Sequence, residues 1–434
     1  MNILIIGGGV GGLALAGLID DQKHNVAILE KNAPELQARR GQWFDHINLS
    51  QLIKLGLGDL LPPETLLASE APERTLAGPS RKFKLRFKIG APAYAPVWRP
   101  DLLAALRTRA AAKAQIRYDT RVNAILIEGE RVTGVTLTDG REIRADLVVD
   151  ASGLGGLSRP LLADLYCRDE DFLTLWRADF PADDSFSPGD NFDVRPTNGG
   201  VLTRFSRNAA GRVDLLLGQH GAMEPGFVKR ALADALRTHC ADAPPEIDEH
   251  DGDFYILPTR APSLQMVFNG CAMLGDSAYM THPLTGAGIV QTLHAAKILA
   301  EVLSEIDTAD ADALWRYQLR YYKQCAQNSF RLDTIRRFIV DAPDEVLDQI
   351  LEARVFTESD MRRIFMGRFL SLAPQHLLIK GAQLLFHPRV LAEVVDCLAH
   401  ALWAQECARG IPEHYDVKKV AAWQQRTLRG IGSL

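Results

Sequence analysis

A glycine-rich run close to the N-terminus has the spacing of a dinucleotide-binding turn. The frame G-x-G-x-x-G is formed by Gly7, Gly9 and Gly12, with Val10 and Gly11 inside it. In such a turn the first glycine permits the tight bend, the second lets a pyrophosphate approach the backbone, and the third lets the following helix pack on the strand. The helix N-terminus then offers free N–H groups and partial positive charge to the phosphates. The run therefore predicts a nucleotide cofactor.

The residues around this run fit a strand, a turn and a helix in that order. Residues 2–6 are apolar throughout, as expected for a parallel strand covered on both faces, residues 13–19 continue as a helix, and residues 25–29 predict the next strand. Glu30 ends that strand, next to Lys31, and a carboxylate there can accept hydrogen bonds from both hydroxyls of a ribose. The alternative is a glycine-rich turn beside an ordinary surface glutamate. The strand–turn–helix context favours the cofactor.

A second candidate binding segment follows an apolar run at residues 271–274. It combines a Gly-Asp pair with a proline and a Gly-x-Gly frame, and a long helix is expected over residues 286–305. Glycines at the start of a helix let its free N–H groups approach an anionic ligand closely. A loop that merely caps the helix is the alternative. The candidate cofactor contacts of this segment are Gly275, Asp276, Pro283, Gly286, Gly288 and Ile289.

Taken as a set, these segments resemble the class A FAD-dependent monooxygenases, which share the 4-hydroxybenzoate-hydroxylase-like fold. The stretch 279–286 is most similar to the version found in squalene epoxidases. The resemblance implies that Asp276 contacts the ribityl or pyrophosphate part of FAD, and that Pro283 and the glycine-rich helix start lie beside the isoalloxazine ring. It covers residues 1–165 and 265–305.

The middle of the chain carries a variant of a third family motif. Residues 150–153 read Asp-Ala-Ser-Gly, where hydroxylases of the family have Ala-Asp-Gly. This form resembles the geranylgeranyl reductases and the flavin-dependent halogenases. The variant keeps reduction open as an alternative to hydroxylation.

The resemblance implies further contacts where the motifs are softer. Arg99 precedes a helix from which a family guanidinium reaches FAD, and Val122 corresponds to a position beside the adenine. Arg40 and Gly41 fall where the family has a loop near the flavin. For each of these positions, a solvated side chain or a plain core position is an equal alternative.

The order of predicted elements indicates an α/β fold. It consists of a Rossmann-like FAD-binding domain of the GR2 type, an inserted strand-rich substrate domain and a C-terminal helical region. We expect the first part of the FAD-binding domain at residues 1–165, with 66–98 contributing to the substrate sheet. The substrate domain is expected at 166–264, the rest of the FAD-binding domain at 265–308, and the helical region at 309–434.

Three local predictions bear on how the site is built. Residues 46–61 carry apolar side chains on one side of a helix, and residues 267–274 read as one apolar strand. Five aromatic side chains of the substrate region either line an apolar pocket or, as the favoured alternative, form the core of its sheet. They are Phe172, Trp176, Phe180, Phe192 and Phe205.

Composition excludes several classes of protein. The 434 residues are 47% hydrophobic, and 49 basic against 54 acidic side chains give a net charge of −5. Neither a disordered chain nor a dedicated nucleic-acid binder fits these values. The chain start has no basic segment before its apolar run, and the scattered cysteines form no C-x-x-C pair. We therefore expect a cytoplasmic protein with reduced thiols and no metal site.

An apolar stretch at residues 369–404 belongs to the predicted C-terminal helices. Lys380, His387 and Pro388 interrupt it, so it cannot cross a bilayer as one helix. Core packing is the favoured interpretation. A dimer contact and peripheral contact with a membrane surface are the alternatives.

These observations together predict a FAD-dependent monooxygenase, either a hydroxylase or an epoxidase. The resemblance implies that NAD(P)H reduces FAD and that a flavin hydroperoxide then delivers oxygen to a hydrophobic, aromatic or isoprenoid-like small molecule. Because only one G-x-G-x-x-G frame follows a strand, NAD(P)H would dock transiently. His46 and His282 are weak candidates for catalytic groups near the flavin, and no general base is assigned.

Three other functions remain as alternatives. The first is a FAD-dependent reductase that saturates isoprenoid double bonds, as the segment at 150–153 suggests. The second is a flavin-dependent halogenase, although its usual Trp-x-Trp-x-Ile-Pro segment does not occur in the sequence. The third is a non-catalytic flavin-binding protein.

Overall fold

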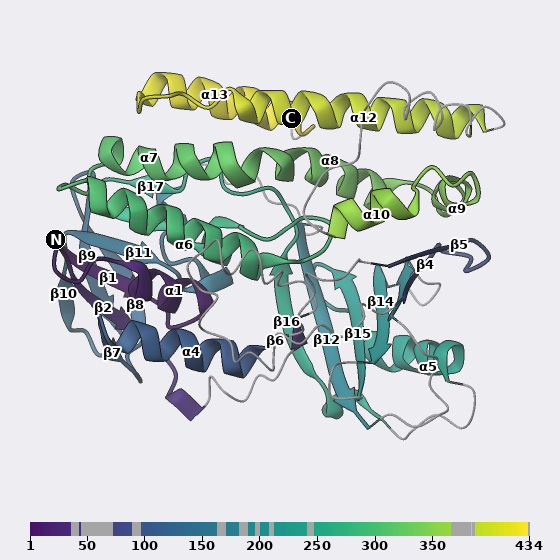
Figure 1. The fold of residues 1–434 in the computed structure, drawn as a ribbon, viewed down its shortest axis with the longest axis horizontal. Helices are drawn as coiled ribbons and strands as arrows, with labels where there is room; N and C mark the ends of the chain where they lie inside the picture. The colour runs from purple at the N-terminus through teal and green to yellow at the C-terminus, as the bar shows by residue number, and fades with distance from the viewer. Residues whose placement is uncertain are drawn as a thin grey trace.

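Figure 1 shows the computed structural model of the chain, with two sheets side by side and layers of helices along one edge. The helix expected at 46–61 and the candidates Arg40, Gly41 and His46 lie outside the described residues, so those predictions stay predictions. The structure describes residues 1–35, 43–44, 73–88, 97–162, 171–181, 190–195, 200–207, 212–240, 247–365, 383 and 387–432.

The first sheet has six strands in the order β17-β18-β11-β1-β2-β7. β1 pairs in parallel with both β2 and β11, and the parallel pairing continues outwards to β7 and β18. The carboxyl ends of β1, β2, β11 and β18 therefore meet at one edge, where open α/β sheets bind their ligands. The strands are β1 (Asn2–Ile6), β2 (Asn25–Leu29), β7 (Gln115–Arg117), β11 (Leu147–Asp150), β17 (Val267–Phe268) and β18 (Cys271–Met273).

Both faces of this sheet are covered, which explains why its strands are apolar throughout. Ile3 and Ile5 face a helical layer, whereas Leu4 and Ile6 face a three-stranded antiparallel sheet. The predicted α/β fold class is confirmed by this arrangement. The helical layer contains α1 (Val10–Leu18), α4 (Arg99–Ala111) and α6 (Gly288–Glu305), and the small sheet contains β8 (Val122–Glu128), β9 (Arg131–Leu137) and β10 (Glu142–Arg144).

The prediction of a single strand at 267–274 was wrong. The segment is a tight hairpin in which Val267 pairs with Ala272 in antiparallel register. Gly270 turns the chain with a φ of +74°, and a side chain there would collide with the carbonyl oxygen of Val132. The Asn-Gly pair at the turn is a strong hairpin signal that the apolar run concealed.

The second sheet has seven strands in the order β16-β12-β15-β14-β13-β4-β5. All neighbours are antiparallel except β13 and β4, which are parallel. Two strands from early in the chain thus extend a sheet whose other strands lie between 172 and 258. The strands are β4 (Glu73–Ala77), β5 (Lys84–Lys88), β12 (Phe172–Phe180), β13 (Asp190–Val194), β14 (Leu202–Arg207), β15 (Val213–His220) and β16 (Asp253–Pro258).

The two faces of the second sheet have different partners. Trp176, Phe180 and Phe205 pack against helix α5 (Phe227–His239) in a closed core, as the favoured sequence interpretation predicted for them. Phe192 lies instead on the opposite face, which lines a cavity. The alternation of side chains along a strand separates these two roles.

The helices after α6 form two layers, and α12 and α13 lie outermost (Figure 1). α13 joins the main core through Trp423, which packs edge-on against Trp315 and Tyr322. α12 exposes Val395 and Trp403 to solvent. Within the described residues, no helix combines the length and the apolar character needed to cross a bilayer. The helices are α7 (Ala311–Tyr321), α8 (Gln327–Asp341), α9 (Asp344–Glu352), α10 (Glu358–Phe365), α12 (Pro388–Arg409) and α13 (Val417–Gly430).

Candidate functional site

A cavity of about 1010 Å³ lies between the two sheets and extends from the carboxyl edge of the first to the inner face of the second. It lies where the fold brings residues 7–11 together with residues 275–289, so both glycine-rich segments contribute to one site. The predicted cofactor residues that line it are Gly7, Gly9, Val10, Gly11, Glu30, Lys31, Arg99, Val122, Gly275, Asp276, Pro283, Gly286, Gly288 and Ile289.

The turn between β1 and α1 requires glycine for three different reasons. Gly7 has a φ of +104°, and a Cβ there would lie 2.5 Å from the carbonyl oxygen of Ala151. A Cβ on Gly12 would collide with the carbonyl oxygen of Gly7, so Gly12 serves packing and lies behind the cavity lining. A Cβ on Gly9 would meet no atom within 4 Å, so Gly9 leaves space for a ligand.

Glu30 lies at the cavity wall with only 5% of its surface exposed. Its Oε2 accepts a hydrogen bond from the Gly8 N–H at 2.7 Å, and its Oε1 accepts one from the Asn32 N–H at 2.9 Å. Each carboxylate oxygen retains a lone pair for another donor. The geometry therefore fits a ribose whose two hydroxyls donate to one fixed carboxylate.

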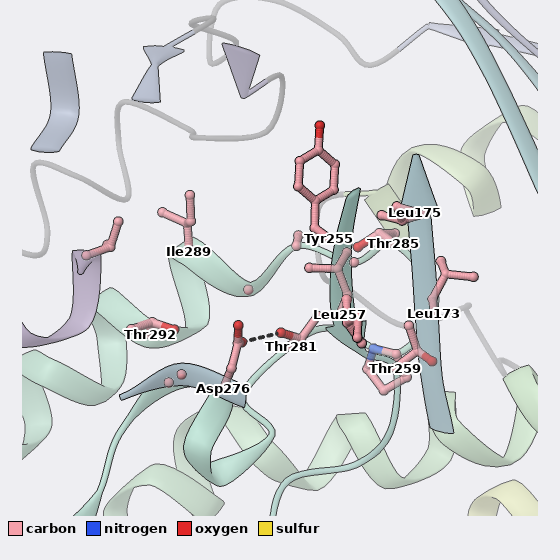
Figure 2. Close-up of a pocket in the computed structure, with 18 of the residues that line it drawn as sticks. Leu173, Leu175, Tyr255, Leu257, Thr259, Asp276, Thr281, Thr285, Ile289 and Thr292 are labelled. Carbon is pink, nitrogen blue, oxygen red and sulfur yellow. Dashed lines mark hydrogen bonds between the residues drawn. The ribbon is translucent and has the colours of Figure 1, made fainter. Parts of the chain in front are cut away.

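The second segment is built around Asp276 and Thr281. The Thr281 hydroxyl donates to Asp276 Oδ1 at 2.9 Å, as the dashed line in Figure 2 shows. A Cβ on Gly288 would lie 2.7 Å from Thr281 Oγ1, so glycine lets the start of α6 pack against this pair. Figure 2 places Ile289 and Thr292 of α6 beside Asp276.

Two helices begin at the cavity without a capping side chain. The N-cap residues Gly9 of α1 and Ala287 of α6 make no side-chain hydrogen bond, and neither helix has an acidic residue in its first turn. The first N–H groups of a helix have no partner within the helix and carry partial positive charge. An elongated ligand with anionic groups, such as FAD, fits between these two helix starts.

Sequence reasoning missed the role of Asp150, the last residue of β11. Its buried carboxylate accepts hydrogen bonds from the N–H and hydroxyl groups of both Ser152 and Ser158, at 2.6–3.0 Å. These bonds shape the loop whose residues Ser152, Gly153 and Leu157 line the cavity. The signal was present as one aspartate with serines two and eight residues later, but only the folded loop shows that one carboxylate serves both.

The part of the cavity beyond the second segment is mostly apolar. Leu173 and Leu175 of β12 and Leu257 of β16 point into it, and the hydroxyl of Tyr255 extends from the same strand (Figure 2). Apolar side chains of two helices complete this chamber opposite the sheet. They are Leu332, Ile335 and Ile339 of α8 and Met361 and Ile364 of α10.

The far end of the chamber is charged. Arg177 lines it and binds the buried carboxylate of Asp214 through two hydrogen bonds of 2.5 and 2.7 Å. Burial lowers the pKa of Arg177, but the charge of Asp214 and its hydrogen bonds, together with smaller contributions from Tyr255 and Asp179, raise the pKa overall. Arg204 shares the same carboxylate at 3.9 Å. The chamber is therefore lined by apolar side chains and ends at the buried ion pair of Arg177 and Asp214.

His282, a candidate catalytic group, lies behind the lining with 4% of its surface exposed. Burial lowers the pKa of His282 to about 4, so the imidazole is neutral at neutral pH. Its ring contacts Thr285 of its own loop. The side chain thus faces the loop that lines the cavity instead of the cavity itself.

Comparison with known proteins gives three findings that bear on this site. A family model described as "FAD binding domain" matches residues 1–326. The chain is 25% identical over 394 residues to digeranylgeranylglycerophospholipid reductase 2 of Methanopyrus kandleri, a match that covers 84% of this chain and 93% of that protein. It is 24% identical over 343 residues to squalene epoxidase 3 of Arabidopsis thaliana, covering 74% of this chain and 64% of that protein.

A solved structure resembles the whole arrangement. It is a geranylgeranyl bacteriochlorophyll reductase-like protein from Thermoplasma acidophilum, with a TM-score of 0.69 and 16% sequence identity. The superposition covers 91% of this chain and 98% of that one. At this level of identity the likeness shows a shared fold.

Proposed function

Because the chain belongs to the FAD binding domain family and is a FAD-dependent oxidoreductase, we propose that it is a monooxygenase that transfers oxygen to an apolar small molecule. NAD(P)H would serve as the reductant. The observation that carries the proposal is the continuity of the cavity, which joins both glycine-rich segments to an apolar chamber. Bound FAD would supply hydride acceptance and the reaction with O₂, chemistry that no side chain provides.

We place FAD along the cavity from Glu30 to α6. Glu30 would hold the adenosine ribose, and the free N–H groups at the start of α1 would face the pyrophosphate. Asp276 would bind the ribityl or pyrophosphate region, and the start of α6 would face the isoalloxazine ring. Partial positive charge at that helix start favours negative charge on the ring.

The chamber would hold the substrate against the flavin and keep water away from it. Leu173, Leu175 and Leu257 form its wall close to Thr285, as Figure 2 shows. Transfer of an apolar substrate from water into the chamber is favourable by about 25 cal/mol per Å² of buried apolar surface. Tyr255 offers a hydroxyl for one polar group of the substrate.

The names of two relatives support a substrate with carbon–carbon double bonds. One relative is named a squalene epoxidase and the other a digeranylgeranylglycerophospholipid reductase, so both names contain an isoprenoid. The apolar chamber of this chain suits a molecule of that kind. We therefore propose an isoprenoid-like substrate that is oxygenated at a double bond or at an adjacent carbon.

Saturation of a double bond is the second candidate. It is favoured by the extent of the match to the Methanopyrus kandleri reductase, which covers 93% of that protein. The Asp-Ala-Ser-Gly form of the segment at 150–153 supports the same reading. Saturation needs the same cavity and reductant but adds two hydrogen atoms in place of oxygen.

A single assay distinguishes the two reactions. The FAD-loaded protein is incubated with NADH or NADPH and either squalene or geranylgeraniol under ¹⁸O₂, and the products are analysed by mass spectrometry. The monooxygenase predicts a product that carries one ¹⁸O atom. A product two hydrogens heavier, formed also without O₂, would establish saturation instead. A protein that takes up no FAD would contradict both.

A further inference from the structure

The loop between Thr281 and α6 is closed on itself through one residue, His282. The backbone oxygen of His282 accepts a hydrogen bond from the Gly286 N–H at 2.9 Å. The backbone N–H of His282 donates to the carbonyl oxygen of Ala287 at 3.4 Å. Its imidazole Nδ1 accepts from the Thr285 N–H at 3.2 Å and lies 3.0 Å from Thr285 Oγ1. One residue thus holds three consecutive positions of the loop.

These hydrogen bonds determine the form of the imidazole. A backbone N–H can only donate, so Nδ1 must carry a lone pair and the proton must sit on Nε2. The lowered pKa of His282 agrees, since burial keeps the ring uncharged. Nε2 has no hydrogen-bond partner among the described residues. The ring therefore binds the loop through Nδ1.

The loop that His282 holds is the wall of the cavity. Pro283, Leu284 and Thr285 line it, followed by Gly286, Ala287 and Gly288 at the start of α6. Gly286 has a φ of +68°, and a Cβ there would lie 3.4 Å from Leu257 Cδ1 of β16. The N–H groups of residues 285 and 286 are bound to His282, whereas the first N–H groups of α6, which begins at the cavity lining, have no partner within the helix.

We propose that His282 is a positioning residue for FAD, which braces the loop through Nδ1 so that the first amides of α6 meet the isoalloxazine ring. The proposal rests on the placement of FAD proposed above. His282 touches neither FAD nor substrate in this role. It acts through Thr285 and the backbone of the loop.

Two amide side chains test which ring atom matters. In His282→Asn the Oδ1 atom can take the place of Nδ1, whereas in His282→Gln the polar atoms lie one bond further out, near the place of Nε2. We expect His282→Asn to bind FAD as the wild type does. We expect His282→Gln to bind it ~10-fold more weakly, because the part-buried Thr285 N–H then lacks its acceptor. FAD titration by flavin fluorescence and the visible spectrum of bound FAD are the measurements.

A buried histidine elsewhere provides the control for general damage. His24 is 4% exposed, and its Nε2 lies 2.9 Å from the carbonyl oxygen of Leu303, near the opposite end of α6. His24→Gln should leave FAD affinity and the flavin spectrum unchanged even where it lowers the unfolding temperature. Equal loss of FAD in His24→Gln and His282→Gln would overturn the proposal.

Other outcomes separate this inference from the placement of FAD. Gly288→Val would put a branched side chain against Thr281. If the isoalloxazine ring lies at the start of α6, this variant should not bind FAD. If Gly288→Val loses FAD while His282→Gln keeps full FAD affinity and an unchanged flavin spectrum, the proposed position of FAD is retained and the proposed role of His282 is wrong. If Gly288→Val retains FAD, the placement itself is wrong. Equal weakening by Asn and Gln at residue 282 also overturns the Nδ1 argument.

Discussion

Glu30 combines two properties at the scale of a single residue, because it is both buried and held by backbone donors. The Gly8 and Asn32 N–H groups fix its carboxylate at the cavity wall before any ligand arrives. A fixed acceptor loses little conformational freedom when a ribose binds. Glu30 is therefore the residue at which a small change should affect FAD most directly.

We expect Glu30→Gln to weaken FAD binding, because the neutral amide replaces a charged acceptor. A hydrogen bond to a charged group contributes about 1.5–3 kcal/mol, which predicts a loss of roughly tenfold or more in affinity. Equilibrium titration of the FAD-free protein measures it. Glu301→Gln on the exposed side of α6 serves as the matched control and should have no effect. Equal affinities of Glu30→Gln and wild type would contradict the ribose assignment.

At the scale of elements, the turn between β1 and α1 contains glycines that serve the fold and one, Gly9, for which we predict a role in ligand binding. Gly12 lets α1 approach the turn, because any Cβ would collide with the Gly7 carbonyl oxygen. Gly9 has an ordinary φ of −78° and open space where its side chain would be. The same residue type thus carries two functions three positions apart.

We expect Gly9→Ala and Gly12→Ala to fail in opposite ways. Gly9→Ala should keep the unfolding temperature of the FAD-free protein while FAD affinity falls, since the methyl group enters the ligand space. Gly12→Ala should lower the free energy of unfolding by about 1–3 kcal/mol or more, because the helix is forced from the strand. Thermal unfolding without FAD and FAD titration separate the two effects. If Gly9→Ala binds FAD as strongly as the wild type, FAD does not lie against this turn.

At the scale of the whole molecule, a buried ionic cluster ties three parts of the chain together. Asp171, which immediately precedes β12, accepts hydrogen bonds from Arg336 and Arg337 of α8, both at 2.8 Å. Asp333 binds the same arginines and also accepts from the Ala261 N–H at 3.1 Å, in the link back to the first sheet. Helix α8, which roofs the chamber, is thereby fixed relative to both sheets.

The cluster predicts how stability depends on pH. Burial raises the pKa of Asp333, but Arg336, Arg337 and the Ala261 N–H together outweigh it and hold the pKa below its ordinary value of 3.8. Stability from a carboxyl with a lowered folded pKa is complete above the unfolded value and is lost as pH falls through the folded value. Asp333→Asn should cost about 3–5 kcal/mol at neutral pH, because two buried guanidiniums lose a partner.

Urea denaturation of both proteins across pH measures this prediction. The gap between wild type and Asp333→Asn should stay constant from pH 7 to about pH 5 and narrow only in stronger acid. A difference that already narrows near neutral pH would contradict the assigned cause.

The peripheral membrane contact considered for the C-terminal helices stays a prediction. Val395, Leu402 and Trp403 of α12 are the exposed apolar residues on which it would depend.

Much of the candidate site was predictable because its determinants are local. A glycine turn between a strand and a helix, followed by Glu30, has a spacing set by backbone geometry over a few residues. The same holds for the Gly-Asp pair and the Gly-x-Gly frame at 275–288. Fourteen residues predicted from these patterns and from the family resemblance line one cavity, as the structure places them.

The remainder depended on contacts between residues far apart in the chain. Phe192 faces the cavity while Phe205 is core, because strand register, which no local pattern sets, assigns each to a face of the sheet. Asp171 meets α8 across more than 160 residues. His282 was visible as a residue type, but folding decided that its ring turns towards Thr285 and away from the cavity. Backbone geometry over short spans is encoded locally, whereas the direction in which a side chain faces follows from packing of the entire chain.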